Sequence, residues 1–309
     1  MKMPDLNFLQ RPILLDGGMG RELRFRGVDV MTSIWSARAL IDSPAVVREV
    51  HSDFIAAGAD IITINSYGIV KSNLAWAGIE DRFEELNLLA CELAKEARDA
   101  SGRDVLIAGS LPPLAGSYRP DRVGKFEEIE PLYREQAEVL APHVDILLCE
   151  TMSSADEGRA AAAAATQTGK PVWVCWTLHE DRSGRLRSGE NIGNAARTLA
   201  DLPISGVLAN CCAPESITKA MPQLKQTGLK YVGGYANTFQ PIPDNWDLVG
   251  DKKTDGSIGL RADLDPESYA VHTNDWLKAG ATVIGGCCGT RPAHIAKLRT
   301  LLDDVSENR

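Results

Sequence analysis

The sequence lacks long apolar runs and clusters of basic residues. No uninterrupted apolar stretch approaches the roughly 18 residues of a membrane-spanning helix. The first residues, Met1 to Asp5, contain no apolar core like that of a secretory signal peptide. Lysine and arginine form no run, and the formal net charge is −9, which argues against partners with a phosphate backbone. We therefore expect a cytoplasmic protein with small-molecule substrates and no nucleic-acid or membrane partner. The sequence leaves monomer and homo-oligomer open.

A disulfide framework is also missing. The seven cysteines are an odd number, and most of them lie in apolar, strand-like runs rather than at loop spacings. Cys91, Cys149 and Cys175 lie inside a predicted helix or strands, so we expect them to be small hydrophobic core residues. Reduced thiols are typical of a reducing compartment.

Short apolar runs rich in β-branched residues alternate with helix-like stretches along the whole chain, which predicts parallel strands joined by helices. The predicted strands are Pro12–Asp16, Asp60–Asn65, Val105–Ser110, Asp145–Glu150, Val172–Trp176, Gly206–Asn210, Tyr231–Tyr235 and Thr282–Gly286. Eight such units in 309 residues fit a (β/α)₈ TIM barrel better than a doubly wound sheet of five or six strands. Because the sequence shows no linker or charge block, we expect a single α/β domain over residues 1–309.

Helix start and stop signals support this organisation. Ser43 and Pro44 open a helix that Gly58 closes, and Pro214 opens one that Gly228 closes. A final helix is predicted over Pro292–Leu302.

The most informative motif is the adjacent pair Cys287 and Cys288 between glycines, together with Cys211. In a barrel, functional groups lie at the carboxyl ends of the strands, and these cysteines directly follow the sixth and eighth predicted strands. Three thiolates around Zn²⁺ leave one tetrahedral position open, as in catalytic zinc sites. A thiol in that position would be ionised at neutral pH, which points to alkyl transfer to sulfur.

Several alternatives stay open at this point. Cys212 competes with Cys211 as a ligand, although strand alternation favours only one of the two, and we expect Cys211. The pair Cys287 and Cys288 would otherwise be buried without a function, form a redox couple or belong to an iron–sulfur cluster, whose cysteine spacing usually differs. In a purely structural zinc site, His294 would be the nearest fourth ligand.

Two carboxylates are predicted at the same end of the barrel. Asp16 ends the first predicted strand and Glu150 the fourth, and Gly17 follows Asp16. Carboxylates and accessible backbone amides suit a zwitterionic amino acid. The competing interpretation is that both carboxylates cap helices or are solvated. The segment Asp16–Gly20 lacks the complete glycine pattern of a dinucleotide-binding turn.

In these motifs the chain resembles the zinc-dependent homocysteine S-methyltransferases, whose members use S-methylmethionine, S-adenosylmethionine or betaine as methyl donors. The resemblance runs nearly end to end. Its segments are Leu15–Gly20 with Glu22 and Leu23, Trp35–Ala37, Ala57–Ile62, Asn65–Tyr67, Ala108–Ser110, Asp145–Thr151, Asn210 with Cys211, and Gly285–Thr290 with His294 and Ile295.

The resemblance implies that Cys211, Cys287 and Cys288 bind zinc, and that Asp16 and Glu150 contact the amino group of homocysteine. The implied reaction is attack of the zinc-bound homocysteine thiolate on the methyl group of an onium donor, giving methionine. Two other hypotheses remain: a different thiol or selenol acceptor, and a barrel that binds zinc or an amino acid without turnover.

The donor is left open. Ser110–Pro113 and Tyr235–Asn237 depart from the sequences common in relatives that use S-methylmethionine, and both segments are expected at the donor side. Trp35, Tyr67 and Tyr235 are candidates for a cation–π cage, with core packing as the alternative. We include these three aromatic residues and Asn237 among the expected substrate-binding residues. Residues 244–265 form a polar loop that is either a lid or a solvated excursion.

Overall fold

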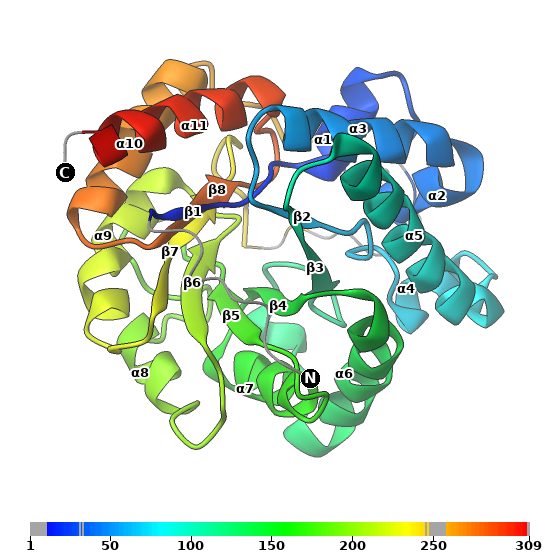
Figure 1. Ribbon diagram of the computed structural model, residues 1–309. Helices are drawn as coiled ribbons and strands as arrows, with labels where there is room; N and C mark the ends of the chain where they lie inside the picture. Colours follow the sequence, from blue (N-terminus) through cyan, green and yellow to red (C-terminus); the bar gives the residue numbers. More distant parts are fainter. Residues whose placement is uncertain (1–10, 31, 33, 245, 247–257, 308–309) are drawn as a thin grey trace.

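The computed structural model describes residues 11–30, 32, 34–244, 246 and 258–307. Strands and helices alternate along the described chain (Figure 1). The strands are β1 (Ile13–Leu14), β2 (Ile61–Thr63), β3 (Leu106–Leu111), β4 (Ile146–Met152), β5 (Val172–Trp176), β6 (Gly206–Asn210), β7 (Tyr231–Ala236) and β8 (Val283–Gly286). The α-helices are α1 (Met19–Phe25), α2 (Arg38–Asp42), α3 (Pro44–Ala56), α4 (Lys71–Trp76), α5 (Phe83–Ser101), α6 (Phe126–Leu140), α7 (Ala155–Thr166), α8 (Ile192–Arg197), α9 (Pro214–Lys225), α10 (Pro266–Lys278) and α11 (Pro292–Glu307).

The strands form one parallel sheet in the order β1-β8-β7-β6-β5-β4-β3-β2. A parallel bridge between Leu15 and Ile61 joins the two ends of this order, so the sheet closes on itself. Figure 1 shows the strands in the middle of the molecule and the helices around them. This arrangement confirms the predicted (β/α)₈ barrel.

The helices form where the start and stop signals and the apolar spacing agree. Helix α3 begins at Pro44 and ends before Gly58, whose φ of +106° favours glycine. Its buried residues Val47, Val50 and Phe54 share one helical face, which packs on the hydrophobic core. The predicted start of α9 is also confirmed. Helix α11 is longer than predicted and runs to residue 307.

The barrel has an inner and an outer apolar core. The inner cluster contains one or two residues from each strand, including Trp173 of β5 and Cys175 beside it in the same strand. The outer cluster, between strands and helices, contains Cys91 and Cys149. All three cysteines are buried, as predicted. No helix among the described residues has the length and apolar character needed to cross a membrane.

The carboxyl ends of five strands differ from prediction by one or two residues, and two of these differences concern the carboxylates at the mouth of the barrel. β1 ends at Leu14, before Asp16, whose amide donates to Ile61 O and whose side chain accepts from the Thr63 amide. β4 does not end at Glu150 but continues to Met152, with a register shift after Cys149. Glu150 therefore lies in the irregular last part of β4, where the register shifts.

Candidate functional site

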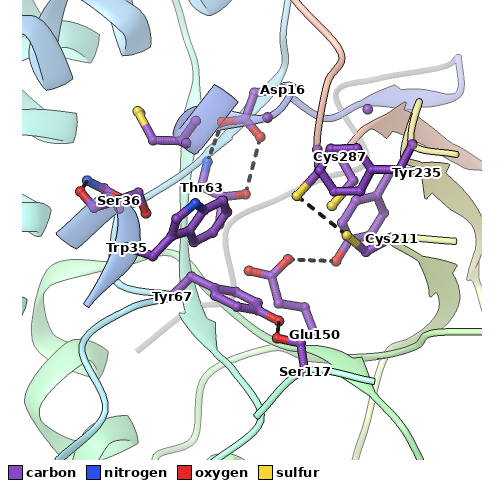
Figure 2. Close-up of a pocket in the computed structure, with 18 of the residues that line it drawn as sticks. Asp16, Trp35, Ser36, Thr63, Tyr67, Ser117, Glu150, Cys211, Tyr235 and Cys287 are labelled. Atoms are coloured by element: carbon purple, nitrogen blue, oxygen red, sulfur yellow. Dashed lines mark hydrogen bonds between the residues drawn. The ribbon is translucent and has the colours of Figure 1, made fainter. Parts of the chain in front are cut away.

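A cavity opens at the carboxyl ends of the strands, and its empty space together with the open solvent at its mouth amounts to about 860 Å³. Glu150 of β4, Cys211 after β6 and Tyr235 of β7 lie in its wall together with residues that follow β1 and β8 (Figure 2). Its aromatic lining consists of Trp35, Tyr67, Tyr118, Tyr235, Phe239 and Trp246. None of the described residues that line it is lysine, arginine or histidine. The charged groups of this wall are therefore acidic.

Three sulfur atoms converge on one side of the cavity. The ligand atoms of Cys211, Cys287 and Cys288 all lie within 4.8 Å of one another, and Cys211 Sγ is 3.6 Å from Cys288 Sγ. The hydroxyl of Tyr118 lies 3.0 Å from Cys211 Sγ. The structure thus brings together the cysteines that the sequence places far apart.

Cys212 and His294 do not join this cluster. The Cys212 side chain is fully buried in the outer core, as strand alternation predicts for the neighbour of Cys211. The ring of His294 is occupied elsewhere: Nδ1 accepts from the Arg291 amide and Nε2 lies 3.1 Å from Leu264 O. The described structure therefore offers three cysteine ligands at the cavity without this histidine.

The backbone around the sulfur cluster is under local constraint. Cys211 has a φ of +49°, a left-handed conformation that is unfavourable for a residue with a side chain. Gly289, directly after the cysteine pair, has a φ of +84°. A Cβ at Gly17 would lie 2.7 Å from the ring of Phe54, so a larger residue would displace the loop that faces the cysteines.

The thiols interact strongly with one another. Hydrogen bonds from Cys287 and Cys288 lower the pKa of Cys211 well below its usual value. Hydrogen bonding to Cys211 and Cys288 is the main reason why the pKa of Cys287 is raised well above its usual value, and burial raises it further. The cluster thus holds one negative charge readily, and further thiolates need a cation among them. Three soft sulfur donors without a nearby basic group fit a thiophilic metal ion.

Asp16 and Glu150 are buried carboxylates in the same cavity. Asp16 Oδ2 accepts from the Thr63 amide at 2.8 Å, and Oδ1 accepts from the Thr63 hydroxyl at 3.3 Å. Glu150 accepts hydrogen bonds from the hydroxyls of Ser110 and of Tyr235, the latter at 3.1 Å. Figure 2 shows Glu150 between Tyr235 and the pair formed by Tyr67 and Ser117.

Burial makes these carboxylates hard to ionise. Burial raises the pKa of Asp16 to about 8, against hydrogen bonds from Thr63 that lower it, and repulsion from Glu150 raises it further. Burial also raises the pKa of Glu150 to about 7, although Ser110 and Tyr235 stabilise the charged form. A bound cation would remove most of this penalty. A positively charged ligand would therefore stabilise the ionised form of both carboxylates and would itself bind favourably.

The buried Asp16 should weaken the metal-free fold as the pH rises. Between about pH 4 and pH 8 the aspartate ionises in the unfolded chain but stays protonated in the fold, so folding loses stability across that window. We expect Asp16→Asn to remove this loss, which amounts to a few kcal/mol at roughly 1.4 kcal/mol per pKa unit. Urea unfolding at pH 5 and pH 8 checks this: the variant's advantage should grow with pH. An equal difference at both values would contradict it.

Of the residues expected to bind substrate, the three aromatic ones line the cavity. Trp35 and Tyr67 meet edge to face at 5.8 Å, and both line the cavity. Tyr235 lines it too and holds Glu150. The side chain of Asn237 accepts from the Phe239 amide and does not line the cavity formed by the described residues, so its contact with substrate stays a prediction.

The polar loop 244–265, for which the sequence leaves open both a lid and a solvated excursion, lies partly outside the described residues, which omit 245 and 247–257. The described ends of this loop reach the site: Trp246 and Ile258 line the cavity. An antiparallel bridge between Phe239 and Leu260 joins the chain before and after the loop.

Tyr118 is the main site residue that sequence reasoning missed. Its side chain is 4% exposed, its ring packs on Trp246 at 5.3 Å, and the guanidinium of Arg187 lies 5.5 Å from the ring centre. The available signal was its position in the loop after the third strand, because such loops carry the functional groups of barrels.

Tyr118→Phe should weaken metal retention without unfolding the protein. The change removes only the hydroxyl that contacts Cys211 Sγ and keeps the ring between Trp246 and Arg187. We expect the affinity for zinc to fall about 10-fold or more, as for other groups that hydrogen-bond to metal ligands. Competition with a chromophoric chelator measures this, and unchanged affinity would contradict a role for the hydroxyl.

Known proteins are similar to this chain over nearly its whole length. The family model described as homocysteine S-methyltransferase matches residues 13–302. A homocysteine S-methyltransferase of Escherichia coli (strain K12) is 30% identical over 306 residues, covering 93% of this chain and 94% of that protein. A selenocysteine methyltransferase of Astragalus bisulcatus is 27% identical, covering 94% of this chain and 93% of that protein.

A solved structure is similar over the whole barrel. The metallated form of the homocysteine methyltransferase MmuM from Escherichia coli matches with a TM-score of 0.80 and 30% identity, covering 97% of this chain and 99% of that one. The chain belongs to the homocysteine S-methyltransferase family. It is an S-methyltransferase with a (β/α)₈ barrel.

Proposed function

We propose that this enzyme transfers a methyl group from an onium donor to the sulfur of homocysteine, with zinc held by Cys211, Cys287 and Cys288. The observation that carries the proposal is the convergence of three cysteine sulfurs within 4.8 Å in the wall of a cavity that also contains Asp16 and Glu150. The family and the named relatives support homocysteine as the acceptor. Zinc is favoured because its tetrahedral thiolate sites are common in proteins.

The two carboxylates would bind the amino group of the acceptor. An ammonium group replaces the proton that each buried carboxylate otherwise retains, and a charge-assisted hydrogen bond to it contributes about 1.5–3 kcal/mol. Ser110 and Tyr235 fix the orientation of Glu150, and Thr63 fixes that of Asp16. Gly17 brings backbone close to the bound molecule.

The sulfur of the acceptor would then lie at the cysteine cluster. When bound there, zinc favours the ionised form of a thiol in its open position at neutral pH. The thiolate sulfur attacks the methyl carbon, and the bond from this carbon to the onium atom breaks. The electron pair of that bond stays with the donor, which loses its positive charge. The proton of the acceptor thiol goes to solvent when the thiol ionises, so no general base is required.

The aromatic wall suits a cationic donor. Trp35, Tyr67 and Tyr235 present ring surfaces to the cavity, and each cation–π contact contributes on the order of 0.5–2 kcal/mol. Positive charge also meets the acidic groups of the wall, whereas the described lining residues include no base that would repel it. Both a sulfonium and a quaternary ammonium fit these features.

The test is formation of methionine, measured by mass spectrometry with reduced, zinc-loaded enzyme and homocysteine. S-methylmethionine, S-adenosylmethionine, betaine and dimethylsulfoniopropionate are supplied separately, with zinc-depleted enzyme as the control. We expect methionine from at least one donor, and only with zinc. Absence of methionine with every donor, despite bound zinc, would overturn the proposal.

A selenol acceptor is the second candidate, because a relative that covers 94% of this chain is named selenocysteine methyltransferase. Competition between homocysteine and selenocysteine for one donor decides which acceptor has the higher kcat/KM. A barrel that binds without turnover is disfavoured by membership of an enzyme family. We also propose that one barrel domain spans residues 1–309 and that the enzyme serves methionine biosynthesis in the cytoplasm, where its thiols stay reduced.

A further inference from the structure

The side chain of Asn210 connects the carboxyl ends of two strands, β4 and β6, at the mouth of the barrel. Asn210 is the last residue of β6 and is fully buried. Its Oδ1 accepts from the Thr151 amide at 2.8 Å, and its Nδ2 donates to Thr151 Oγ1 at 3.0 Å. Thr151 belongs to β4, and β5 lies between the two strands in the sheet. One side chain therefore ties together strands that are not direct neighbours.

Both ends of this connection lie beside a residue of the proposed site. Thr151 directly follows Glu150, and Asn210 directly precedes Cys211. Thr151 and Cys211 both have left-handed backbone conformations, with φ values of +62° and +49°. Such conformations persist only where surrounding contacts impose them. The two hydrogen bonds of Asn210 are contacts of this kind at Thr151.

Cys211 has further supports that do not involve the Asn210 side chain. Its amide donates to Tyr235 O at 3.0 Å, and its carbonyl accepts from the Thr177 hydroxyl at 3.2 Å. The backbone amide after Glu150, by contrast, is held by the Asn210 carboxamide. Loss of this carboxamide should therefore move Glu150 more than Cys211.

We infer that Asn210 is a positioning residue that sets the separation between Glu150 and the cysteine cluster, and thereby selects the chain length of the amino-acid thiol. This inference rests on the proposed function, in which the amino group of the acceptor binds at Glu150 and its sulfur at the cluster. Homocysteine and cysteine carry the same groups and differ by one methylene between them. If the separation between Glu150 and the cysteine cluster is fixed, only one of the two amino acids fits well. If the separation can vary, both should bind with more similar affinity.

The experiment compares binding of homocysteine and cysteine to zinc-loaded protein by titration calorimetry, with zinc content measured on the same samples. We expect Asn210→Ala to keep its zinc, to bind homocysteine about 10-fold more weakly and to lose most of its preference over cysteine. In steady-state assays KM for homocysteine should rise more than kcat falls. Thr151→Ser keeps the amide and a hydroxyl, so it should retain the preference.

Asn87→Ala is the matched control for loss of a buried amide. Asn87 is fully buried in α5, and its Nδ2 donates to Phe83 O outside the cavity. This variant should lose stability and keep the preference for homocysteine. An Asn210→Ala protein with unchanged preference would overturn the inference alone. A wild-type protein that binds zinc but not homocysteine would overturn this inference and the proposed function together.

Discussion

Cys287→Ser is expected to abolish methyl transfer and to leave a folded barrel. A serine hydroxyl stays protonated at neutral pH and is a hard donor, so the cluster keeps only two thiolates for a soft metal. The loss should exceed the 10–100-fold that follows removal of a group which merely supports a ligand. Because Cys287 is half-buried at the mouth and not in the central core, the far-ultraviolet dichroism should not change.

The measurements are zinc per chain by mass spectrometry and methionine formed under saturating homocysteine. Cys91→Ala serves as the control, since Cys91 is a buried cysteine of α5 outside the cavity. It should lose some stability and keep both zinc and activity. A Cys287→Ser enzyme with full zinc and full methionine formation would contradict the proposed site.

Glu150→Gln is expected to weaken homocysteine binding strongly. The amide keeps the size of the side chain and can still accept from Tyr235 and Ser110, but it removes the negative charge that would meet the ammonium group. Loss of a charge-assisted hydrogen bond of about 1.5–3 kcal/mol corresponds to a rise of roughly 10- to 150-fold in KM. Zinc content should not change, because Glu150 is not part of the cysteine cluster.

Glu157→Gln is the matched control for Glu150→Gln. Burial raises the pKa of Glu157 to about 7, as it does for Glu150. Its Oε2, however, accepts from the amide and hydroxyl of Ser153 at the start of α7. The glutamine oxygen can still accept these hydrogen bonds outside the cavity, so Glu157→Gln should leave KM unchanged. Equal KM values for Glu150→Gln and the wild type would exclude the proposed ammonium site.

The barrel could be predicted because each of its units is encoded locally. Apolar runs such as the one at Val172–Trp176 are bounded by turn and capping residues, and Pro44 and Gly58 mark the two ends of one helix. Strand ends at the mouth were less predictable. The irregular exit of β4 depends on Thr151 and on the side chain of Asn210, which lies 59 residues away in the sequence.

The site could be predicted only in part. Adjacent cysteines at a strand end are a strong local signal, and strand alternation separates Cys211 from Cys212. Tyr118 has no such signal, since its place beside Cys211 comes from the path of the loop after β3. The role expected for Asn237 stays a prediction, since its side chain accepts from the Phe239 amide and does not line the cavity formed by the described residues.

The most direct test of the central claim is X-ray absorption at the zinc edge, with and without homocysteine. The proposed site predicts three sulfur neighbours from Cys211, Cys287 and Cys288 in the free enzyme, and one additional sulfur when homocysteine is bound. Fewer than three sulfur neighbours in the free enzyme would contradict the ligand set. An unchanged sulfur count under saturating homocysteine would contradict activation of the acceptor by the metal.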